Sequence, residues 1–251
     1  MINDDLQLRD RRIAVTGAAS GIGLATVRAL AKSGARLALL DCDAAALAAI
    51  ADELMTTDCA PLRFVVDVVD ESRIEEAFSS IDEAWGGLEV LIHVAGIMRE
   101  QATDIREISA DSWNHVLAVN LSGAFLACRA ASRIMIPQQK GTMILIGSRA
   151  GVASASGSIP YGASKGGVNG LAMTLQKHLA PHHIRVHNFC PGSVDTPLFN
   201  KSLDERISHG ASPRDAESAR AGSVDAAGVG QAIALLASPL AEYLQGPIFS
   251  R

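Results

Sequence analysis

The stretch "RIAVTGAASGIGLATV", residues 12–27, runs from apolar residues through a glycine-rich turn into a segment with helical periodicity. Gly17, Gly21 and Gly23 separate the expected strand from a helix that begins near Gly21. Glycines allow a tight turn and a close approach of the backbone to a pyrophosphate, which then rests on the N-terminus of the helix. The stretch therefore predicts a strand–turn–helix unit that holds a dinucleotide, with Ser20 and Ile22 also in contact with it.

The rest of the chain repeats this alternation of apolar runs and helical segments. Further runs rich in Ile, Val and Leu are "RLALLD", "LRFVVD", "EVLIHVAG", "TMILIGS" and "IRVHNFCPG". Strands that are apolar throughout are typical of a parallel sheet with both faces covered. Helical periodicity is found between them, over residues 22–33, 44–55, 72–85, 109–135 and 157–179. We therefore predict an α/β fold, with a doubly wound parallel sheet and helices on both faces.

Composition and charge limit the other possibilities. The 251 residues are 48% hydrophobic, which predicts a single domain over residues 1–251. The net charge of -5, without a run of lysine or arginine, does not indicate nucleic-acid binding. The opening "MINDDLQLRDRR" is charged where a secretory signal is apolar, and no segment offers about 20 unbroken apolar residues, so we expect a cytoplasmic protein without a membrane helix.

Cysteine and histidine do not indicate a metal site. Cys42, Cys59, Cys128 and Cys190 are far apart, so we expect small, buried, reduced side chains. The histidines of "PHHIRVH", residues 181–187, lack helical spacing and an acidic or thiol partner. This stretch is interpreted as a surface turn that leads into a strand.

Asp41 ends the run "LALLD", about 20 residues after the glycine turn. A carboxylate at this place accepts hydrogen bonds from the adenosine ribose and repels a 2'-phosphate. Because neither the turn nor the residue after Asp41 offers an arginine, NAD is favoured over NADP. The alternative is that Asp41 caps the next helix, a role that Asp43 fills equally well.

The stretch "SIPYGASKGGVNG", residues 158–170, places Tyr161 and Lys165 one helical turn apart. A neighbouring ammonium is expected to lower the tyrosine pKa from about 10, which makes the phenol a usable acid or base. Ser148 ends the run "TMILIGS", where its hydroxyl can hold a substrate oxygen. The alternative is a packed tyrosine beside a lysine stem; the small residues around both count against it.

Several motifs together resemble those of the short-chain dehydrogenase/reductase family. They are "TGAASGIG", "VAG" at Val94 to Gly96, Asn120 in "VNLSG", Ser148, "YGASK" and "PGSVDTP", and they span nearly the whole chain in the family's order. The resemblance implies a Rossmann-type fold, a nicotinamide cofactor and hydride transfer between that cofactor and an alcohol or carbonyl group.

The resemblance also implies residue roles. Tyr161 would be the acid/base, Lys165 would bind the nicotinamide ribose and tune Tyr161, Ser148 would polarise the substrate oxygen, and Asn120 would hold a relay water. For the cofactor, it implies adenine contacts from Asp67 and Val68, backbone contacts from Ala95 and Gly96, and a nicotinamide end lined by Pro191, Gly192, Val194 and Thr196. No metal is required.

Two positions depart from the family pattern. His93 stands where the family usually has asparagine; we expect little cost, and an ordinary strand residue is the alternative. The C-terminal "YLQGPIFSR" lacks the usual Asp-Gly-Gly turn, and Pro247 cannot donate a ladder hydrogen bond, so the last strand should be short or at an edge. We therefore expect a homo-oligomer, a dimer or tetramer, that is weakened.

The polar segment over residues 196–224 shows the least regular pattern in the chain. Its length predicts a lid over a site, with a plain surface loop as the alternative. Met98, Arg99, Ser154 and the lid from Leu198 onward are candidates for the substrate pocket. Arg99 is the only charged side chain expected there, and a solvated surface arginine is the alternative for it.

Three functions are compatible with the sequence. The first is an NAD-dependent oxidoreductase for a secondary alcohol or ketone of a small or medium polar compound, such as a sugar, polyol, diol or hydroxy acid. The second is a 3-oxoacyl thioester reductase of fatty-acid synthesis, which would use NADPH. The third is a nucleotide-binding protein without catalysis, which the presence of Tyr161, Lys165 and Ser148 disfavours.

Overall fold

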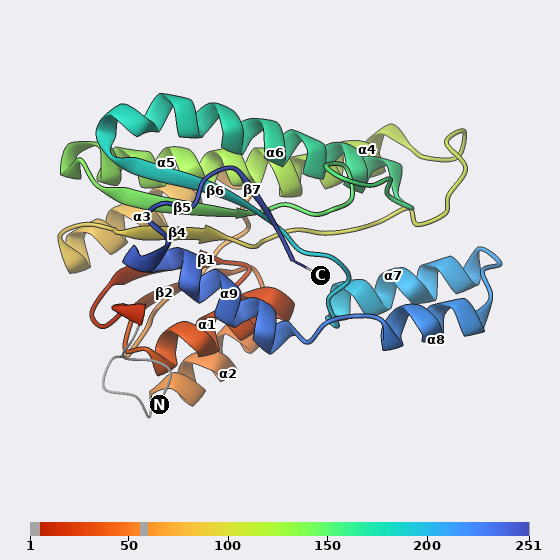
Figure 1. The fold of residues 1–251 in the computed structure, drawn as a ribbon, viewed down its shortest axis with the longest axis horizontal. Coiled ribbons are helices and arrows are strands. Elements are labelled where there is room, and N and C mark those ends of the chain that lie inside the picture. Colours follow the sequence, from red (N-terminus) through yellow and green to blue (C-terminus); the bar gives the residue numbers. More distant parts are fainter. Residues whose placement is uncertain (1–5, 56–59, 251) are drawn as a thin grey trace.

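The sheet lies at the centre of the molecule. The computed structural model describes residues 6–55 and 60–250, so Cys59 lies outside the described part. The strands found there are β1 (Arg12–Thr16), β2 (Arg36–Asp41), β3 (Leu62–Val65), β4 (Val90–His93), β5 (Gly141–Ile146), β6 (Ile184–Cys190) and β7 (Pro247–Phe249). They pair in parallel in the order β3-β2-β1-β4-β5-β6-β7 (Figure 1). The predicted parallel sheet is confirmed.

The helices cover both faces of this sheet. They are α1 (Gly21–Lys32), α2 (Ala44–Leu54), α3 (Glu71–Trp85), α4 (Ala110–Leu117), α5 (Gly123–Gln138), α6 (Ile159–Leu179), α7 (Pro197–Ser208), α8 (Pro213–Ala221) and α9 (Ala226–Ala237). Helices α1, α2 and α9 cover one face and α3, α5 and α6 the other, whereas α7 and α8 lie beyond one end of the sheet (Figure 1). Helix α9, which the sequence analysis did not predict, packs against α1. Among the described helices, none has the length and apolar character that crossing a membrane requires.

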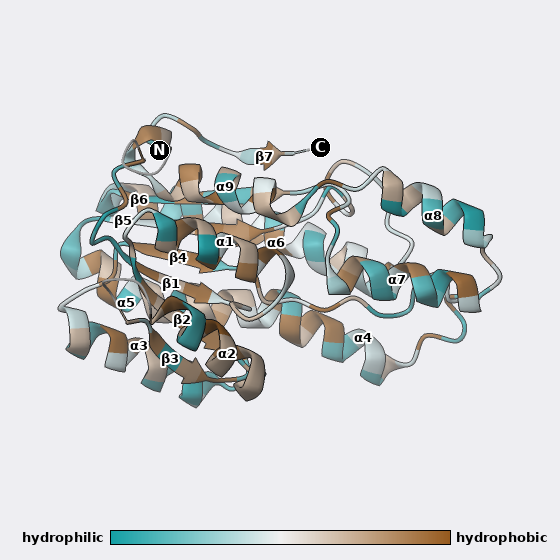
Figure 2. Cartoon of the chain, turned by 90° about the horizontal axis from the view of Figure 1, so that it is seen from below, coloured by the Kyte–Doolittle hydropathy of each residue, from teal (hydrophilic) through white to brown (hydrophobic). Residues whose placement is uncertain are grey.

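Strand residues alternate between two apolar clusters. In β1, Ile13 and Val15 pack with α1, α2 and α9, whereas Ala14 packs with α3, α5 and α6. All four residues of β4 and all six of β5 are buried, and Figure 2 shows the hydrophobic strands between helices whose hydrophilic residues face outward. The absence of polar alternation in these strands therefore follows from burial on both sides.

The predicted helix over residues 109–135 is interrupted. Helices α4 and α5 are joined by a π-helical turn over Ala118–Ser122, which contains Asn120. The Asn120 Oδ1 accepts a hydrogen bond from the backbone nitrogen of Ile97 at 2.7 Å. Its Nδ2 donates a hydrogen bond to the backbone oxygen of Ile97 at 2.9 Å. Such π-helical turns are frequent at functional sites, and this one ties α5 to the loop after β4.

The segment over residues 196–224, expected to be irregular, forms the helices α7 and α8. Each begins with a proline, which suits the first turn because its missing N–H has no helical partner there. Val194 and Val224 form a β-bridge, so the segment leaves and rejoins the domain at one point. Arg220 donates hydrogen bonds to Asn200 and Asp204, which hold α8 against α7. Helix α8 contains few apolar residues, which is why the prediction missed it. In α7, Phe199, Leu203 and Ile207 are spaced four residues apart, and this signal was present in the sequence but was not used.

Two smaller expectations have mixed outcomes. Strand β7 has three residues and lies at the edge of the sheet beside β6, as predicted from Pro247. Cys128 and Cys190 are buried and unpaired as expected, but Cys42 is exposed. The expectation was wrong for Cys42 because this residue follows the carboxyl end of β2, outside the core.

Two histidines lie in the core. His187 in β6 is 1% exposed, and neither ring nitrogen has a hydrogen-bond partner in the described chain. His93 in β4 bonds Thr16 through Nδ1, at 2.9 Å from the hydroxyl oxygen. Burial lowers the pKa of His187 to about 4 and that of His93 to about 3, with smaller contributions from Arg185 and Lys165, respectively. His93 is therefore a buried, neutral strand residue.

Acid should destabilise the protein through His187. The unfolded chain binds a proton there below pH 6.5, whereas the folded chain binds it only near pH 4, so this stability is present above pH 6.5 and is lost as the pH falls. We expect His187→Leu to lose about 3 kcal/mol less unfolding free energy than the wild type between pH 7 and pH 4, measured by urea unfolding. His178→Leu, on the exposed side of α6, is the control. Equal losses in wild type and His187→Leu would contradict this account.

Candidate active site

A cavity of about 1030 Å³ opens at the carboxyl ends of the strands. It lies where the strand order reverses, because β1 has β2 on one side and β4 on the other. Loops from both halves of the sheet diverge at such a point, and the resulting crevice is the usual place for a dinucleotide in this architecture. The cavity is therefore the candidate site.

The cavity wall contains most of the residues predicted from the sequence. At the cofactor and catalytic positions they are Gly17, Ser20, Gly21, Ile22, Asp41, Asp67, Val68, Ala95, Gly96, Ser148, Tyr161, Lys165, Pro191, Gly192, Val194 and Thr196. Met98, Ser154 and Leu198, predicted for the substrate end, line it as well. Residues far apart in the sequence thus meet at one place.

The glycine turn leaves no room for larger side chains. Gly17 has φ +64, and a Cβ there would lie 2.7 Å from the backbone nitrogen of Ala95. A Cβ on Gly23 would lie 1.8 Å from the carbonyl oxygen of Gly17. Gly23 itself lies behind the wall, where it allows α1 to pack against the turn. The turn therefore brings backbone and the N-terminus of α1 to the cavity surface, as an anion site requires.

Hydrogen bonds hold the Asp41 carboxylate in place at the cavity wall. Its Oδ2 accepts a hydrogen bond from the backbone nitrogen of Ala19 at 2.9 Å, and its Oδ1 accepts one from that of Asp43 at 3.0 Å. The cap of α2 is provided by Asp43, whose side chain accepts from the nitrogen of Ala46. Asp41 therefore does not cap α2, and its carboxylate lines the cavity.

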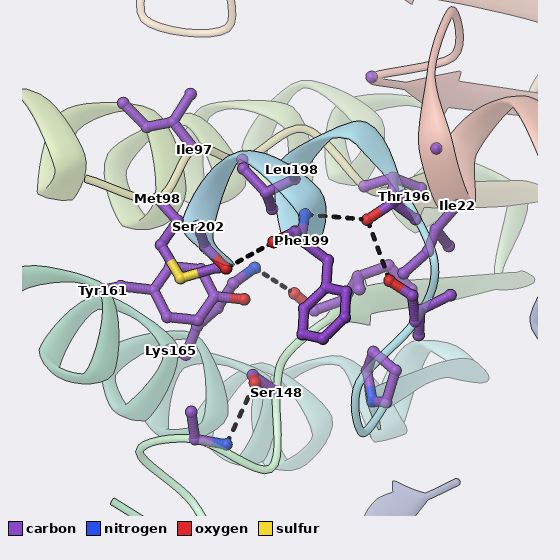
Figure 3. A pocket seen from close by; sticks show the side chains of 18 of the residues that line it. Ile22, Ile97, Met98, Ser148, Tyr161, Lys165, Thr196, Leu198, Phe199 and Ser202 are labelled. Atoms are coloured by element: carbon purple, nitrogen blue, oxygen red, sulfur yellow. Dashed lines mark hydrogen bonds between the residues drawn. The ribbon is translucent and has the colours of Figure 1, made fainter. Parts of the chain in front are cut away.

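Tyr161, Lys165 and Ser148 form the polar group at the other end. Tyr161 and Lys165 lie on the same side of α6, with the lysine Nζ 5.7 Å from the centre of the tyrosine ring (Figure 3). Ser158 caps α6 by accepting a hydrogen bond from the Tyr161 nitrogen, and Pro160 lies in the first turn. The Ser148 hydroxyl accepts a hydrogen bond from the nitrogen of Ala150 at 3.1 Å. The cap and the strand end thus fix the positions of these groups.

The protonation of this group differs from the sequence-based prediction. Burial raises the pKa of Tyr161, while a hydrogen bond with Ser148 opposes the increase. Burial also lowers the pKa of Lys165 to about 8. The Lys165 ammonium donates to the carbonyl oxygen of Ile146 at 2.6 Å rather than to the phenol. The expected lowering of the tyrosine pKa is therefore wrong for this structure, and Tyr161 holds its proton at neutral pH.

Asn120 does not line the cavity. It is 1% exposed, and besides its bonds to Ile97 its Nδ2 donates to the hydroxyl of Ser164 at 2.9 Å. A Cβ on Gly96 would lie 3.3 Å from the Asn120 oxygen and 3.6 Å from the lysine Nζ. Asn120 therefore lies directly behind the wall, where it positions the loop after β4 next to Lys165.

The charged residues near the substrate end were predicted incompletely. Arg99 is exposed and borders a separate hollow with Lys201 and Glu205, so it is not a charge of the main cavity. Arg149 and Arg206 line the main cavity instead. Arg149 directly follows Ser148 in the sequence, and this position next to a predicted site residue could have indicated that Arg149 lines the cavity. Arg206 gave none, because α7 was not predicted to be a helix.

Comparisons with known proteins agree with this geometry. Residues 11–207 match the model of the short chain dehydrogenase family. The chain is 36% identical over 239 residues to galactitol 2-dehydrogenase (L-tagatose-forming) of Cereibacter sphaeroides, and the aligned region covers 94% of this chain and 91% of that protein. It is 31% identical over 243 residues to the 3-oxoacyl-acyl-carrier-protein reductase FabG of Thermotoga maritima, with coverage of 97% and 96%. The crystal structure of an NAD+-bound xylitol dehydrogenase matches with a TM-score of 0.91 at 26% identity, with coverage of 97% and 98%.

Proposed function

The chain belongs to the short-chain dehydrogenase family, whose members oxidise CH–OH groups or reduce the corresponding carbonyl groups, and from this premise we propose that it is an NAD-dependent oxidoreductase. Its substrate is a secondary alcohol or ketone of a small or medium polar compound, such as a sugar, polyol, diol or hydroxy acid. The observation that carries this proposal is the single cavity that contains the glycine turn and Asp41 at one end and Tyr161, Lys165 and Ser148 at the other.

Ser148, Tyr161 and Lys165 have different roles in the reaction at the substrate oxygen. A bound nicotinamide supplies or accepts the hydride. Ser148 holds the oxygen by a hydrogen bond, and Tyr161 gives a proton to it during ketone reduction or removes one during alcohol oxidation. Because Tyr161 holds its proton at neutral pH, reduction starts from the protonation state found here, and oxidation should become faster as the pH rises. Lys165 binds the ribose and, below its pKa of about 8, stabilises the phenolate through its charge.

The residues fit a dinucleotide with a free ribose 2'-hydroxyl. The turn at Gly17 and Gly23 has no space for a Cβ, so backbone N–H groups can approach a pyrophosphate. The carboxylate of Asp41 can accept from ribose hydroxyls and would repel a 2'-phosphate. Asp67 and Val68 supply the adenine contacts, and Thr196 lies beside Gly21, near the pyrophosphate.

The runner-up function is a 3-oxoacyl thioester reductase. The name of the Thermotoga maritima relative supports it, whereas the Cereibacter sphaeroides relative and the xylitol dehydrogenase have names that support the polyol reading. Asp41 supports the first function, because a carboxylate at that place disfavours NADPH.

We also propose that α7 and α8 act as a lid, and that the three-residue β7 weakens assembly into a dimer or tetramer.

Cofactor preference tests the proposal. NAD is expected to raise the melting temperature more than NADP at equal concentration, because the ligand with the lower Kd stabilises the folded state more. Asp41→Ser should bring the melting-temperature shifts with NAD and NADP closer together, because it removes the charge that repels the 2'-phosphate. Asp43→Ser is the matched control, since serine also caps helices and Asp41 stays in place.

Turnover completes this test. A panel of secondary alcohols with NAD, followed by NADH absorbance at pH 7 and pH 9, should give faster oxidation at the higher pH. A larger shift with NADP than with NAD, together with reduction of a 3-oxoacyl thioester, would instead support the runner-up.

A further inference from the structure

Two arginines line the cavity, and their side chains have no partner in the described part of the chain. Arg149 follows β5, and Arg206 lies in the last turn of α7. Within the described residues, neither side chain forms a hydrogen bond or an ion pair. By contrast, Arg129 pairs with Glu71 and Glu75 on the outer surface. Unpaired positive charge on a cavity wall is therefore a local feature of the candidate site.

Arg206 belongs to the wall at the substrate end. Phe199, Ser202 and Arg206 line the cavity at helical spacing, so one side of α7 faces inward. Figure 3 shows Ser202 beside Tyr161 and Met98. Arg206 follows Ser202 by one turn, about 6 Å along the helix axis. Arg206 therefore continues, along α7, the part of the cavity wall to which Ser202 belongs.

Negative charge is confined to the opposite end of the cavity. Among the described lining residues, the carboxylates are Asp41 and Asp67, both at the adenosine end. Glu205 precedes Arg206 in the sequence, but it borders the separate hollow with Lys201. No lining carboxylate of the described chain therefore competes for Arg206 at the substrate end. An anionic ligand group can occupy that place and form charge-assisted hydrogen bonds with the guanidinium.

We propose that Arg206 determines substrate specificity by binding an acid group of the substrate, and that Arg149 adds a second positive charge. The substrate is then a hydroxy acid or the corresponding keto acid, rather than a neutral polyol. This inference rests on the proposed oxidoreductase function. Carboxylate and phosphate groups share the chemistry that a guanidinium recognises, so the experiment compares both.

Matched pairs of alcohols test the inference with NAD as cofactor. Lactate is compared with propylene glycol, and β-hydroxybutyrate with the diol that carries a hydroxymethyl group in place of its carboxylate; glycerol phosphate against glycerol is the phosphate arm. In at least one pair, kcat/KM should be about 10- to 100-fold higher for the acid. Arg206→Gln should remove this advantage by raising KM for the acid with kcat unchanged, because the contact is remote from the reacting carbon.

Two control variants separate the possible outcomes. Lys201→Gln, on the part of α7 that borders the other hollow, should leave the acid advantage unchanged. Arg206→Lys should retain part of it, which shows that charge rather than helix packing is responsible. Equal kcat/KM values for acids and neutral alcohols in the wild type would overturn the inference and leave the proposed function intact.

A binding measurement covers the case in which none of these alcohols is oxidised. Butanoate should change the fluorescence of enzyme-bound NADH at lower concentration than butanol does, and Arg206→Gln should remove the difference. Equal binding of butanoate and butanol to the wild type would overturn the inference. A protein that neither binds NADH nor oxidises any alcohol would contradict the proposed function itself.

Discussion

Replacing Tyr161 by phenylalanine is expected to lower kcat by about 100- to 10,000-fold. Phenylalanine keeps the ring that packs beside Lys165 but has no proton to give or take. Hydride transfer leaves charge on the substrate oxygen unless a proton moves with it, and Ser148 can stabilise that charge only partly. Steady-state turnover with NAD and a secondary alcohol measures the loss.

The rest of the protein should be unaffected by this change. Tyr161→Phe should bind NAD as well as the wild type in a thermal shift assay, because the hydroxyl makes no hydrogen bond that holds the glycine turn. Tyr243→Phe is the matched control: Tyr243 is the second of the 2 tyrosines and is 90% exposed. If Tyr161→Phe and Tyr243→Phe turn over alike, another group moves the proton and the proposed function fails at its central residue.

The sheet and the glycine turn could be predicted because their requirements are local. A strand such as β5, buried along its whole length, is apolar apart from Thr142, whose hydroxyl accepts a hydrogen bond from Arg185, and this is visible in a single run of residues. The turn at Gly17 and Gly23 requires residues without a Cβ, so the sequence itself records the close approach. The place of Asp41 at the end of β2 follows from the same local order.

Other features depend on contacts that a local pattern does not contain. The π-helical turn is linked to the bonds between Asn120 and Ile97, which lie 23 residues apart. Helix α8 has few apolar residues, and its Arg220 holds it to α7 through hydrogen bonds to Asn200 and Asp204. Hydrophobic periodicity could therefore not reveal this helix. The spacing of Tyr161 and Lys165 was visible, but the depth of burial that raises the pKa of Tyr161 was not.

Gly23→Ala should disrupt the packing of α1 against the glycine turn. The added Cβ would lie 1.8 Å from the oxygen and 2.8 Å from the carbon of the Gly17 carbonyl, and both are backbone atoms that cannot rotate away. Either α1 or the turn must shift, which we expect to cost about 1–3 kcal/mol of unfolding free energy or more. Because the shift moves the N–H groups that we propose bind the pyrophosphate, NAD binding should weaken at least about tenfold.

Gly170→Ala is the matched control for this prediction. Gly170 lies within α6, and a Cβ there would meet no atom within 4 Å. Alanine is favoured over glycine in a helix by about 1 kcal/mol, so this variant should be slightly more stable than the wild type and bind NAD equally well. Urea unfolding and NAD titration of both variants separate the two effects. If Gly23→Ala matched Gly170→Ala in stability and NAD affinity, the turn would not be the nucleotide cradle, and the dinucleotide would have to bind elsewhere.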